Sequence, residues 1–512
     1  MTIQIRQTSG NVARVSVTTA SESTALDRLL TRKVKDPVSG LMEPATVVWD
    51  KESKGSGYIP VGLVPWIISK LRNRYNIEDL TYIPDDTYIK LDAEHFSPME
   101  PRDYQINAGR KLLATHRGIL QGITGSGKST IMGAMIKAVL KDTDWNVILI
   151  GFTTDHWVQV QESLRSMGVS SQEVGDGSPS CRVTIGRFSK FDSHLGTGDV
   201  WDRRIRSCEV VLIDEVHHLG SAATYINLAR SMNPLRIYGF DATPFRSAKD
   251  SEGTSTVEDL GTLGYCGPVI EKIDYKYLQV RGYLPLTYVR FIPMPRPPKE
   301  LSSQLPRNIH LETDFETVYK KLIVENDWRT SRFASLITTL AGGGKVLVLI
   351  KQHDHAKRLM HMLESAGVES LAWFGSGQTL AISSFKGVYT PRFGHEEVRR
   401  RFMEGDLPVV IGSSVLSEAI SLDAATDAVN MAAGKVLTLS VQRAGRVMRR
   451  NNGLTPVVTY WDSYDSSNRV LQLQSQERKK QYEQFGLDTF EMNSFASICN
   501  LRSLCITTGY AS

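Results

Sequence analysis

One short segment limits the possible folds of this chain more than any other. Residues 122–129 read Gly-Ile-Thr-Gly-Ser-Gly-Lys-Ser, after the apolar run Gly118–Gln121 and before a helical periodicity over Lys128–Leu140. A glycine-rich loop with this spacing, between a strand and a helix, is typical of parallel α/β sheets in which the loop amides surround a phosphate chain. The sequence therefore predicts a parallel-sheet domain built around this loop.

The loop also carries the side chains that phosphate chemistry needs. Lys128 can reach the β- and γ-phosphates of a nucleotide, and the hydroxyl of Ser129 is a suitable ligand for Mg²⁺. We assign nucleotide binding to the loop and its flanks, which comprise Gly122, Thr124, Gly125, Ser126, Gly127, Lys128, Ser129 and Thr130.

A second segment places two carboxylates after a buried strand. The apolar run Val210–Ile213 is followed by Asp214, Glu215 and, two positions on, His217. Because parallel strands end at one edge of their sheet, these acids are expected near the loop. Asp214 can then hold the metal ion, while Glu215 positions or deprotonates a water molecule. Both segments together predict a Mg²⁺-dependent nucleoside triphosphate hydrolase.

Composition is that of an ordinary globular protein, and 512 residues predict about three or four domains. No window approaches about 18 uncharged apolar residues, and the N-terminus lacks the apolar core of a secretory signal, so we expect a cytoplasmic protein without a membrane span. The five scattered cysteines predict reduced thiols. A formal net charge of +5 is compatible with a polyanionic partner but does not demand one.

The first part of the chain predicts two domains. Residues 1–98 have balanced charge, strand patterns at Val12–Thr19 and Glu43–Trp49, and an amphipathic helix at Pro65–Arg74, which together predict a small N-terminal α+β domain. Residues 99–285 alternate between helices and apolar strands, which predicts a doubly wound parallel sheet. The predicted helices and strands of this domain are Asp103–His116, Lys128–Leu140 and His156–Met167, and Gly118–Gln121, Trp145–Gly151, Arg182–Ile185, Val210–Ile213 and Leu235–Phe240.

The second part repeats the α/β pattern. Residues 286–312 contain four closely spaced prolines and are predicted to be a linker. Residues 313–465 form the second predicted domain, and residues 466–512 a short helical C-terminal extension with its helix at Asn468–Phe485. The predicted elements of the second domain are helices Ile323–Leu340, His355–Ala366 and Glu396–Met403, and strands Val346–Ile350, Ser370–Phe374, Val409–Ile411 and Ala428–Met431, with a loop or small insertion over Gly375–Gly394.

Two further motifs flank the predicted nucleotide loop along the first α/β domain. Arg102 and Gln105 precede the first helix, where a glutamine can read the amino and N7 edge of adenine, although such a segment alone is more often an ordinary helix start. Asp241-Ala-Thr243-Pro ends a strand, where Thr243 could relay nucleotide binding to a nucleic-acid site. Without context, Thr243 is only part of a turn that closes the strand.

The second half carries a cluster of arginines. Arg446 and Arg449 lie three residues apart in Gln442-Arg-Ala-Gly-Arg-Val-Met-Arg, so one helix face can present both guanidinium groups. Arginine suits the charge of a transferring phosphoryl group. The alternative interpretation is a basic surface helix.

The order of these motifs resembles that of a known family. Residues 101–465 carry R-x-Y-Q, GxxGxGKS, DEVH, DATP, SSVLSEAIS and QRAGRVMR, in the order found in superfamily 2 DExH helicases. The resemblance implies two tandem RecA-like domains, ATP and Mg²⁺ in the cleft between them, and single-stranded nucleic acid across their tops.

The resemblance also assigns roles to individual positions. The family's adenine-reading residues fall on Arg102 and Gln105. Its catalytic groups fall on Lys128, Asp214, Glu215, Gln442, Arg446 and Arg449, where the arginines are fingers supplied by the second domain. Its coupling residues fall on His217 and Thr243, and its metal ligands on Ser129 and Asp214.

The hydroxyl groups with which the family contacts the nucleic-acid backbone fall on Thr153, Thr154, Ser413, Ser414 and Ser417. Hydroxyls suit sequence-neutral phosphate binding, although such residues elsewhere are mostly turn or cap residues. The chain departs from the family where Asp241 replaces the first small residue of the S/T-A-T motif and where Ala419-Ile-Ser421 replaces Gly-Ile-Asp. These departures bear on the coupling of hydrolysis to movement and leave the hydrolytic groups intact.

The N-terminal segment resembles one particular group of helicases within this superfamily. Tyr58–Val64, a helix and then Tyr82–Pro84 resemble the small N-terminal domain of phage branch-migration helicases of the UvsW type, which helps engage duplex or branched DNA. The resemblance implies a monomeric ATP-dependent DNA helicase or branch-remodelling translocase of phage recombination and replication, acting in the host cytoplasm. Its implied partners are a single-stranded DNA track, forked or branched duplex DNA, and replication or recombination proteins.

Alternatives stay open. The same core fits an RNA helicase or a duplex-DNA translocase of the restriction-enzyme type. A third alternative is a nucleotide-gated binding module that has lost ATP hydrolysis. The intact hydrolytic groups argue against it, namely Lys128, Asp214, Glu215, Arg446 and Arg449. His217 and His218 lack metal-ligand spacing, and His218 is expected to pack or cap.

Overall fold

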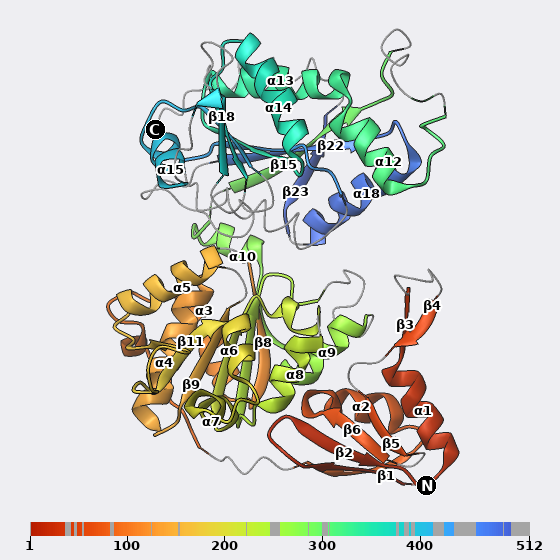
Figure 1. Cartoon of the computed structure of the whole chain (residues 1–512), viewed down its shortest axis with the longest axis vertical. Coiled ribbons are helices and arrows are strands. Elements are labelled where there is room, and N and C mark those ends of the chain that lie inside the picture. The colour runs from red at the N-terminus through yellow and green to blue at the C-terminus, as the bar shows by residue number, and fades with distance from the viewer. Residues whose placement is uncertain are drawn as a thin grey trace. The chain divides into compact units, whose positions relative to one another are not determined.

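A computed structural model of the chain (Figure 1) forms two compact units, Met1–Ile273 and Asp274–Ser512. The described residues are 2–35, 42–45, 49–53, 56–81, 87–123, 125–151, 154–221, 223–245, 256–284, 286–298, 306, 308–374, 378–382, 389–390, 395–412, 424–434, 457–484 and 486–492. None of the helices in these ranges combines the length and apolar character that crossing a bilayer requires.

The first unit begins with a small mixed sheet, whose described strands follow the order β5-β6-β2-β1-β7. Side chains of β1 and β2 alternate between buried and exposed, the period-two pattern of a strand with one face on a core. Its elements are β1 (Thr2–Gln7), β2 (Val12–Ser16), α1 (Ala20–Leu30), β5 (Asp50–Ser53), β6 (Ser56–Pro60), α2 (Val64–Leu71) and β7 (Asn76–Leu80), beside a hairpin of β3 (Arg32–Lys35) and β4 (Met42–Ala45).

The predicted α+β character of this region is confirmed, with the strand predicted from Val12 and the helix predicted from Pro65 both present. The strand predicted over Glu43–Trp49 is confirmed only as far as Ala45, and residues 46–48 lie outside the described ranges. The sequence analysis missed α1, although Thr19 caps it by accepting a hydrogen bond from the backbone N–H of Glu22.

The rest of the first unit is a parallel sheet in the order β10-β11-β9-β12-β13-β8-β14, with helices on both faces (Figure 1). Strands β9, β12 and β13 are buried along their whole length, as expected where helices cover both sides. The strands are β8 (Arg117–Gly122), β9 (Val147–Gly151), β10 (Gln172–Glu173), β11 (Val183–Arg187), β12 (Val210–Asp214), β13 (Arg236–Asp241) and β14 (Val269–Ile273), and the helices are α3 (Asp103–Leu113), α4 (Lys128–Asp142), α5 (Thr154–Ser166), α6 (Phe188–His194), α7 (Val200–Arg206), α8 (Ala223–Ser231) and α9 (Val257–Cys266).

The small sheet packs on the parallel-sheet domain through a side-chain hydrogen bond and a close backbone approach. The side-chain amide of Asn11 is buried and donates to the carbonyl oxygens of Ala229 (2.6 Å) and Met232 (3.2 Å) at the end of α8. Gly62 meets α9 so closely that a Cβ atom there would lie 2.6 Å from the carbonyl oxygen of Leu263. Residues 1–98 therefore share one compact unit with the sheet that follows.

The second unit contains a sheet in the order β19-β18-β17-β20-β16-β21-β22-β15-β23, parallel except where β18 pairs with β17 and β19. The strands are β15 (Leu286–Met294), β16 (Val346–Leu349), β17 (Ser370–Phe374), β18 (Gln378–Ile382), β19 (Tyr389–Thr390), β20 (Val409–Gly412), β21 (Asp427–Asn430), β22 (Val457–Asp465) and β23 (Asp488–Glu491). The helices are α10 (Tyr275–Val280), α12 (Phe315–Tyr319), α13 (Asp327–Ala341), α14 (His353–Ser365), α15 (His395–Met403) and α18 (Arg469–Gln484). The second predicted parallel-sheet domain is therefore confirmed.

The prediction that residues 286–312 are a linker is wrong for its first part, because Leu286–Met294 form β15 between β22 and β23. The proline cluster suggested a break, yet Pro293 lies beyond Tyr288–Phe291, the stretch that pairs with β23. A proline near a strand end, with one pairing neighbour, removes no essential bond of the ladder.

Two further predictions for the second unit need correction. The helix predicted over Ile323–Leu340 begins at Asp327, after a π-helical turn over Lys320–Val324, because Asn326 caps it by accepting from the N–H of Arg329. The C-terminal helix α18 is confirmed, but it is not a free extension: it packs on β22, and β23 then adds to the same sheet.

Candidate nucleotide site

The predicted phosphate loop joins the end of β8 to the start of α4. Gly125 and Gly127 have φ angles of 85° and 79°, a region that glycine enters at little cost. A Cβ atom on Gly127 would displace the side-chain amide of Gln105, and the positive φ of Gly127 would strain any larger residue there. Lys128 turns back over the loop, and its Nζ donates to the carbonyl oxygen of Gly122 at 2.8 Å.

The segment before α3 braces this loop. Nη1 of Arg102 donates to the carbonyl oxygen of Gly125 (3.3 Å), and the hydroxyl of Tyr104 donates to that of Ser126 (2.7 Å). The Gln105 amide donates to the same Ser126 oxygen at 3.4 Å, while its Oε1 accepts from the N–H of Arg102. Arg102 and Gln105 thus lie at the loop as predicted, and Gln105 also caps the helix; adenine reading remains a prediction.

Tyr104 was missed as a site residue. Its hydroxyl donates to the loop and also accepts a hydrogen bond from Nη1 of Arg102 at 2.9 Å. The sequence signal was its place inside the motif, one residue before Gln105. A tyrosine at that position reads as a core residue of α3 until its hydroxyl is seen against the loop.

Asp214 is the last residue of β12 and Glu215 follows it; in the sheet, β13 alone separates β12 from β8. Asp214 is buried and accepts from the N–H of Glu215 at 3.0 Å. Glu215 has a φ of 52°, a left-handed conformation that costs a non-glycine residue roughly 1–3 kcal/mol and is typical of functional sites. Burial raises the pKa of the Glu215 carboxyl, and the charge of Asp241 adds to this, while the nearby Lys128 opposes it.

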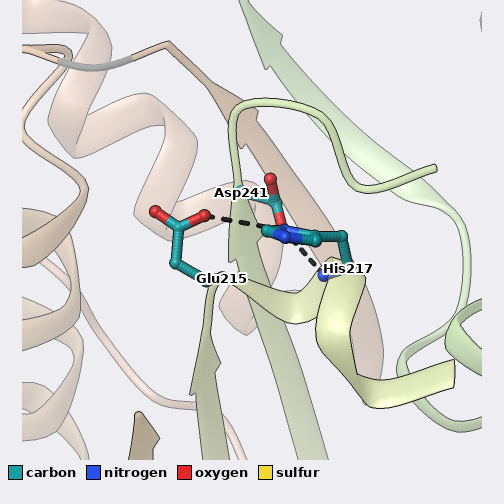
Figure 2. A group of neighbouring side chains, drawn as sticks. All are labelled: Glu215, His217 and Asp241. Carbon is teal, nitrogen blue, oxygen red and sulfur yellow. Dashed lines mark hydrogen bonds and ion pairs between the residues drawn. The ribbon is translucent and has the colours of Figure 1, made fainter. Parts of the chain in front are cut away.

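Figure 2 shows that Glu215, His217 and Asp241 face one another. Oδ2 of Asp241 accepts from the backbone N–H of His217 and from its Nδ1, both at 2.8 Å, and Oδ1 accepts from the N–H of Thr243 at 2.7 Å. Burial works to raise the pKa of Asp241, but the charge and hydrogen bonds of His217, with the N–H of Thr243, lower it to about 2. The ionised carboxylate therefore requires the proton of His217 on Nδ1.

His217 and Thr243, which the family resemblance assigns to coupling, are both bound by Asp241, a residue that the sequence analysis treated only as a departure. One ligand atom from each of Glu215, His217 and Asp241 lies within 4.8 Å of the others, a spacing that would also permit a cation. We interpret the group as a hydrogen-bonded network, because both oxygens of Asp241 accept backbone N–H bonds and Nδ1 donates to it.

The residues of the loop fit a nucleotide with Mg²⁺. The hydroxyl of Ser126 is buried and finds no hydrogen-bond partner within the described part of the chain. Ser129, in the first turn of α4, and Asp214 supply the oxygen ligands that Mg²⁺ prefers, and Lys128 supplies a positive charge beside them. The hydroxyl of Thr130 lies 3.9 Å from Sδ of Met99, so its part in nucleotide binding remains a prediction.

Several predicted site residues cannot be placed. Thr124, Thr153, Ser413, Ser414, Ser417, Gln442, Arg446 and Arg449 lie outside the described residues, as do Ala419 and Ser421. Thr154 begins α5, but its side chain is outside the description too. The described residues of the predicted site therefore all belong to the first unit.

The chain is similar in sequence to several known proteins. Residues 98–246 match the family model of the type III restriction enzyme, res subunit. Putative helicase 22 of the Sulfolobus islandicus filamentous virus is 25% identical over 446 residues, which cover 82% of this chain and 73% of the viral protein. The DNA 3'-5' translocase XPB2 of Sulfurisphaera tokodaii is 23% identical over 369 residues, which cover 69% of this chain and 80% of that protein.

Solved structures resemble the fold. A fragment of a putative HsdR subunit of a type I restriction enzyme from Vibrio vulnificus aligns with a TM-score of 0.52 and 14% identity, covering 87% of this chain and 78% of that one. The crystal structure of T4 UvsW aligns with a TM-score of 0.38 and 17% identity, covering 96% of this chain and 99% of that one. The two parallel sheets and the HsdR alignment confirm the predicted class of two tandem RecA-like domains.

Proposed function

We propose that this chain is a superfamily 2 ATP-dependent DNA helicase or translocase that acts on forked and recombination-intermediate DNA; its motif order and its helicase and translocase relatives support this. The observation that carries the proposal is the convergence of Lys128, Asp214 and Glu215 at one edge of the first parallel sheet. Phosphate recognition and water activation require these groups together.

The chemistry follows from the described groups. The loop amides and Lys128 would hold the phosphates, and Ser129 and Asp214 would hold Mg²⁺, which supplies charge neutralisation when bound. Glu215 would orient the attacking water and accept its proton. A carboxyl whose pKa is raised by burial is a better base near neutral pH than an ordinary glutamate, because catalytic bases work best when their pKa is near the working pH.

The second unit would complete the site. We assign Gln442, Arg446 and Arg449 as the groups that reach the γ-phosphate, and the hydroxyls of Thr153, Thr154, Ser413, Ser414 and Ser417 as contacts to the DNA backbone. Closure on ATP and reopening after hydrolysis would then shift the two domains along one strand. Support comes from the motif order, which is that of the superfamily.

DNA is the proposed track because a DNA translocase is among the relatives and covers 69% of this chain. The restriction-enzyme subunits among the matches favour a second candidate, a duplex-DNA translocase with the same core. We further propose a monomer, in the cytoplasm of a host, with replication or recombination proteins as its partners.

The N-terminal domain would engage the duplex arm. An open groove of about 840 Å³ lies between α1 and the end of α2. Arg28, Lys70 and Arg74 line it together with the hydroxyls of Ser21 and Tyr75, and its described lining includes no acidic side chain. The two hydroxyls lie 3.0 Å apart and join the first turn of α1 to the segment between α2 and β7. Cations and hydroxyls on an open surface suit phosphate oxygens of a nucleic-acid backbone.

The proposed ATP hydrolysis is tested by Lys128→Ala and Glu215→Gln in the full chain. Each change is expected to lower ATP turnover by at least about 100-fold while DNA binding persists. Full turnover by a clean Glu215→Gln preparation would refute the role of that acid. Unwinding of single-strand, fork, four-way-junction and RNA-duplex substrates by the wild type then identifies the track, and a preference for RNA would overturn the DNA assignment.

The groove is tested separately with Arg28→Ala/Arg74→Ala. Loss of two phosphate contacts is expected to reduce the slope of log affinity against log salt by about two for forked DNA, with basal ATP turnover unchanged. Arg6→Ala/Arg14→Ala, on the strands of the same small sheet, removes equal charge outside the groove lining. Equal slopes for the two double variants would refute the groove as the binding surface.

A further inference from the structure

Asp241 is fully buried, and its carboxylate lies at the junction of two segments of the site. It receives three N–H bonds, two from His217 and one from Thr243, so each segment is held by the same group. A hydroxyl has one oxygen and carries no charge, and it could not accept this set of bonds. The aspartate therefore does more here than close a strand.

The ring of His217 links Asp241 to Glu215. Because Nδ1 keeps its proton toward Asp241, the ring has one tautomer and one orientation. The same Nδ1 lies 3.6 Å from Oε2 of Glu215, so it faces both carboxylates (Figure 2). Displacing the ring would remove the Nδ1–H group, with its partial positive charge, from beside the Glu215 carboxylate.

The backbone gives a second link. Glu215 has a left-handed φ of 52°, and the turn that follows is closed by the N–H of His218 donating to the carbonyl oxygen of Glu215 at 3.1 Å. The N–H of His217, inside this turn, is bound by Asp241. A strained conformation persists only where neighbours hold it, and Asp241 is one of the groups that hold this turn.

We propose that Asp241 is a positioning residue for ATP hydrolysis, which acts through His217 to fix the Glu215 carboxylate in the place where it activates water. The inference rests on the proposed ATPase function and adds a residue to it. Asp241 touches neither the loop nor Lys128 by any described hydrogen bond, so its removal should change the chemical step and leave nucleotide binding alone.

The test compares kcat and KM for ATP in the full chain with saturating DNA. Asp241→Asn and Asp241→Thr are expected to lower kcat on the order of 10- to 100-fold, as small misplacements of catalytic groups do, with KM within about threefold of wild type. In a His217→Ala background, which itself lowers kcat, the same Asp241 substitutions should lower kcat by a further factor of less than about two, because the effects of residues that act as one unit are not additive.

Asp202→Asn is the matched control. Asp202 is also buried and accepts backbone N–H bonds from Gly196 and Gly198, but it belongs to α7, away from the loop. Asp202→Asn should lower the melting temperature without changing kcat. If Asp241→Asn does not fold, Asp241→Thr and His217→Ala carry the test alone.

Three results would overturn the proposal: wild-type kcat in Asp241→Thr, an undiminished Asp241 effect in the His217→Ala background, or an equal kcat loss in Asp202→Asn. Failure of the proposed function looks different, because the wild type would then hydrolyse no ATP and Glu215→Gln would change nothing.

Discussion

The brace between Tyr104 and the phosphate loop allows a quantitative prediction. Tyr104→Phe removes one hydroxyl that donates to the carbonyl oxygen of Ser126 at 2.7 Å and accepts from Nη1 of Arg102 at 2.9 Å. A net hydrogen bond contributes roughly 0.5–1.5 kcal/mol, and the substitution removes two of them, while the Gln105 amide still donates to the Ser126 oxygen at 3.4 Å. The loop should therefore lose about 1–2 kcal/mol of its preference for the binding conformation.

This loss should appear mainly as weaker nucleotide binding. About 1–2 kcal/mol corresponds to a 5- to 30-fold change in an equilibrium constant, so we expect KM for ATP to rise by about that factor while kcat stays within about threefold. Steady-state ATPase assays, with titration of a fluorescent nucleotide as an independent check, measure both quantities.

Tyr238→Phe is the control for general destabilisation. The hydroxyl of Tyr238 donates to the carbonyl oxygen of Thr115 at the same distance, 2.7 Å, in the turn between α3 and β8 rather than at the loop. It should lower the melting temperature without raising KM. If both variants change KM equally, or if Tyr104→Phe leaves KM unchanged, the brace does not organise the loop.

Other predictions follow from packing and charge. Gly62→Val should destabilise the first unit by about 1–3 kcal/mol in chemical denaturation, because its side chain would collide with the backbone of α9; no change would contradict the docking of the small sheet. Arg478→Met should cost about 3–5 kcal/mol, since it leaves the buried carboxylate of Asp462 without its bidentate partner, and a neutral result in urea unfolding would show that the pair adds no stability. Burial lowers the pKa of His355 to about 3. The second unit should therefore lose stability as the pH falls from 6.5 toward 3, because the unfolded chain binds a proton that the buried imidazole does not. His355→Gln should flatten this part of the curve of stability against pH, and an unchanged curve would refute the assignment.

Local patterns in the sequence were sufficient to predict the elements that carry the candidate site. The glycine loop and Lys128 lie between β8 and α4, and Asp214 ends β12, as the strand–loop–helix pattern and the apolar run Val210–Ile213 predict. The parallel sheets followed from the alternation of helices and apolar strands. Such signals are local, and the backbone conformations they demand are those that the residues prefer alone.

Contacts between distant segments were decided only by the tertiary structure. The sequence does not indicate that Leu286–Met294 pairs with Val457–Asp465, because the proline cluster after it resembles a break and strand pairing at this separation leaves no local pattern. Likewise, Asp241 reads as a departure from a motif until His217 is seen bonded to it, and Tyr104 reads as core until its hydroxyl meets the loop. Residue type and spacing thus determine which chemistry the chain can perform, whereas the partners of each buried polar group depend on which segments the folded sheet brings together, since such a group must find a hydrogen bond wherever the fold places it.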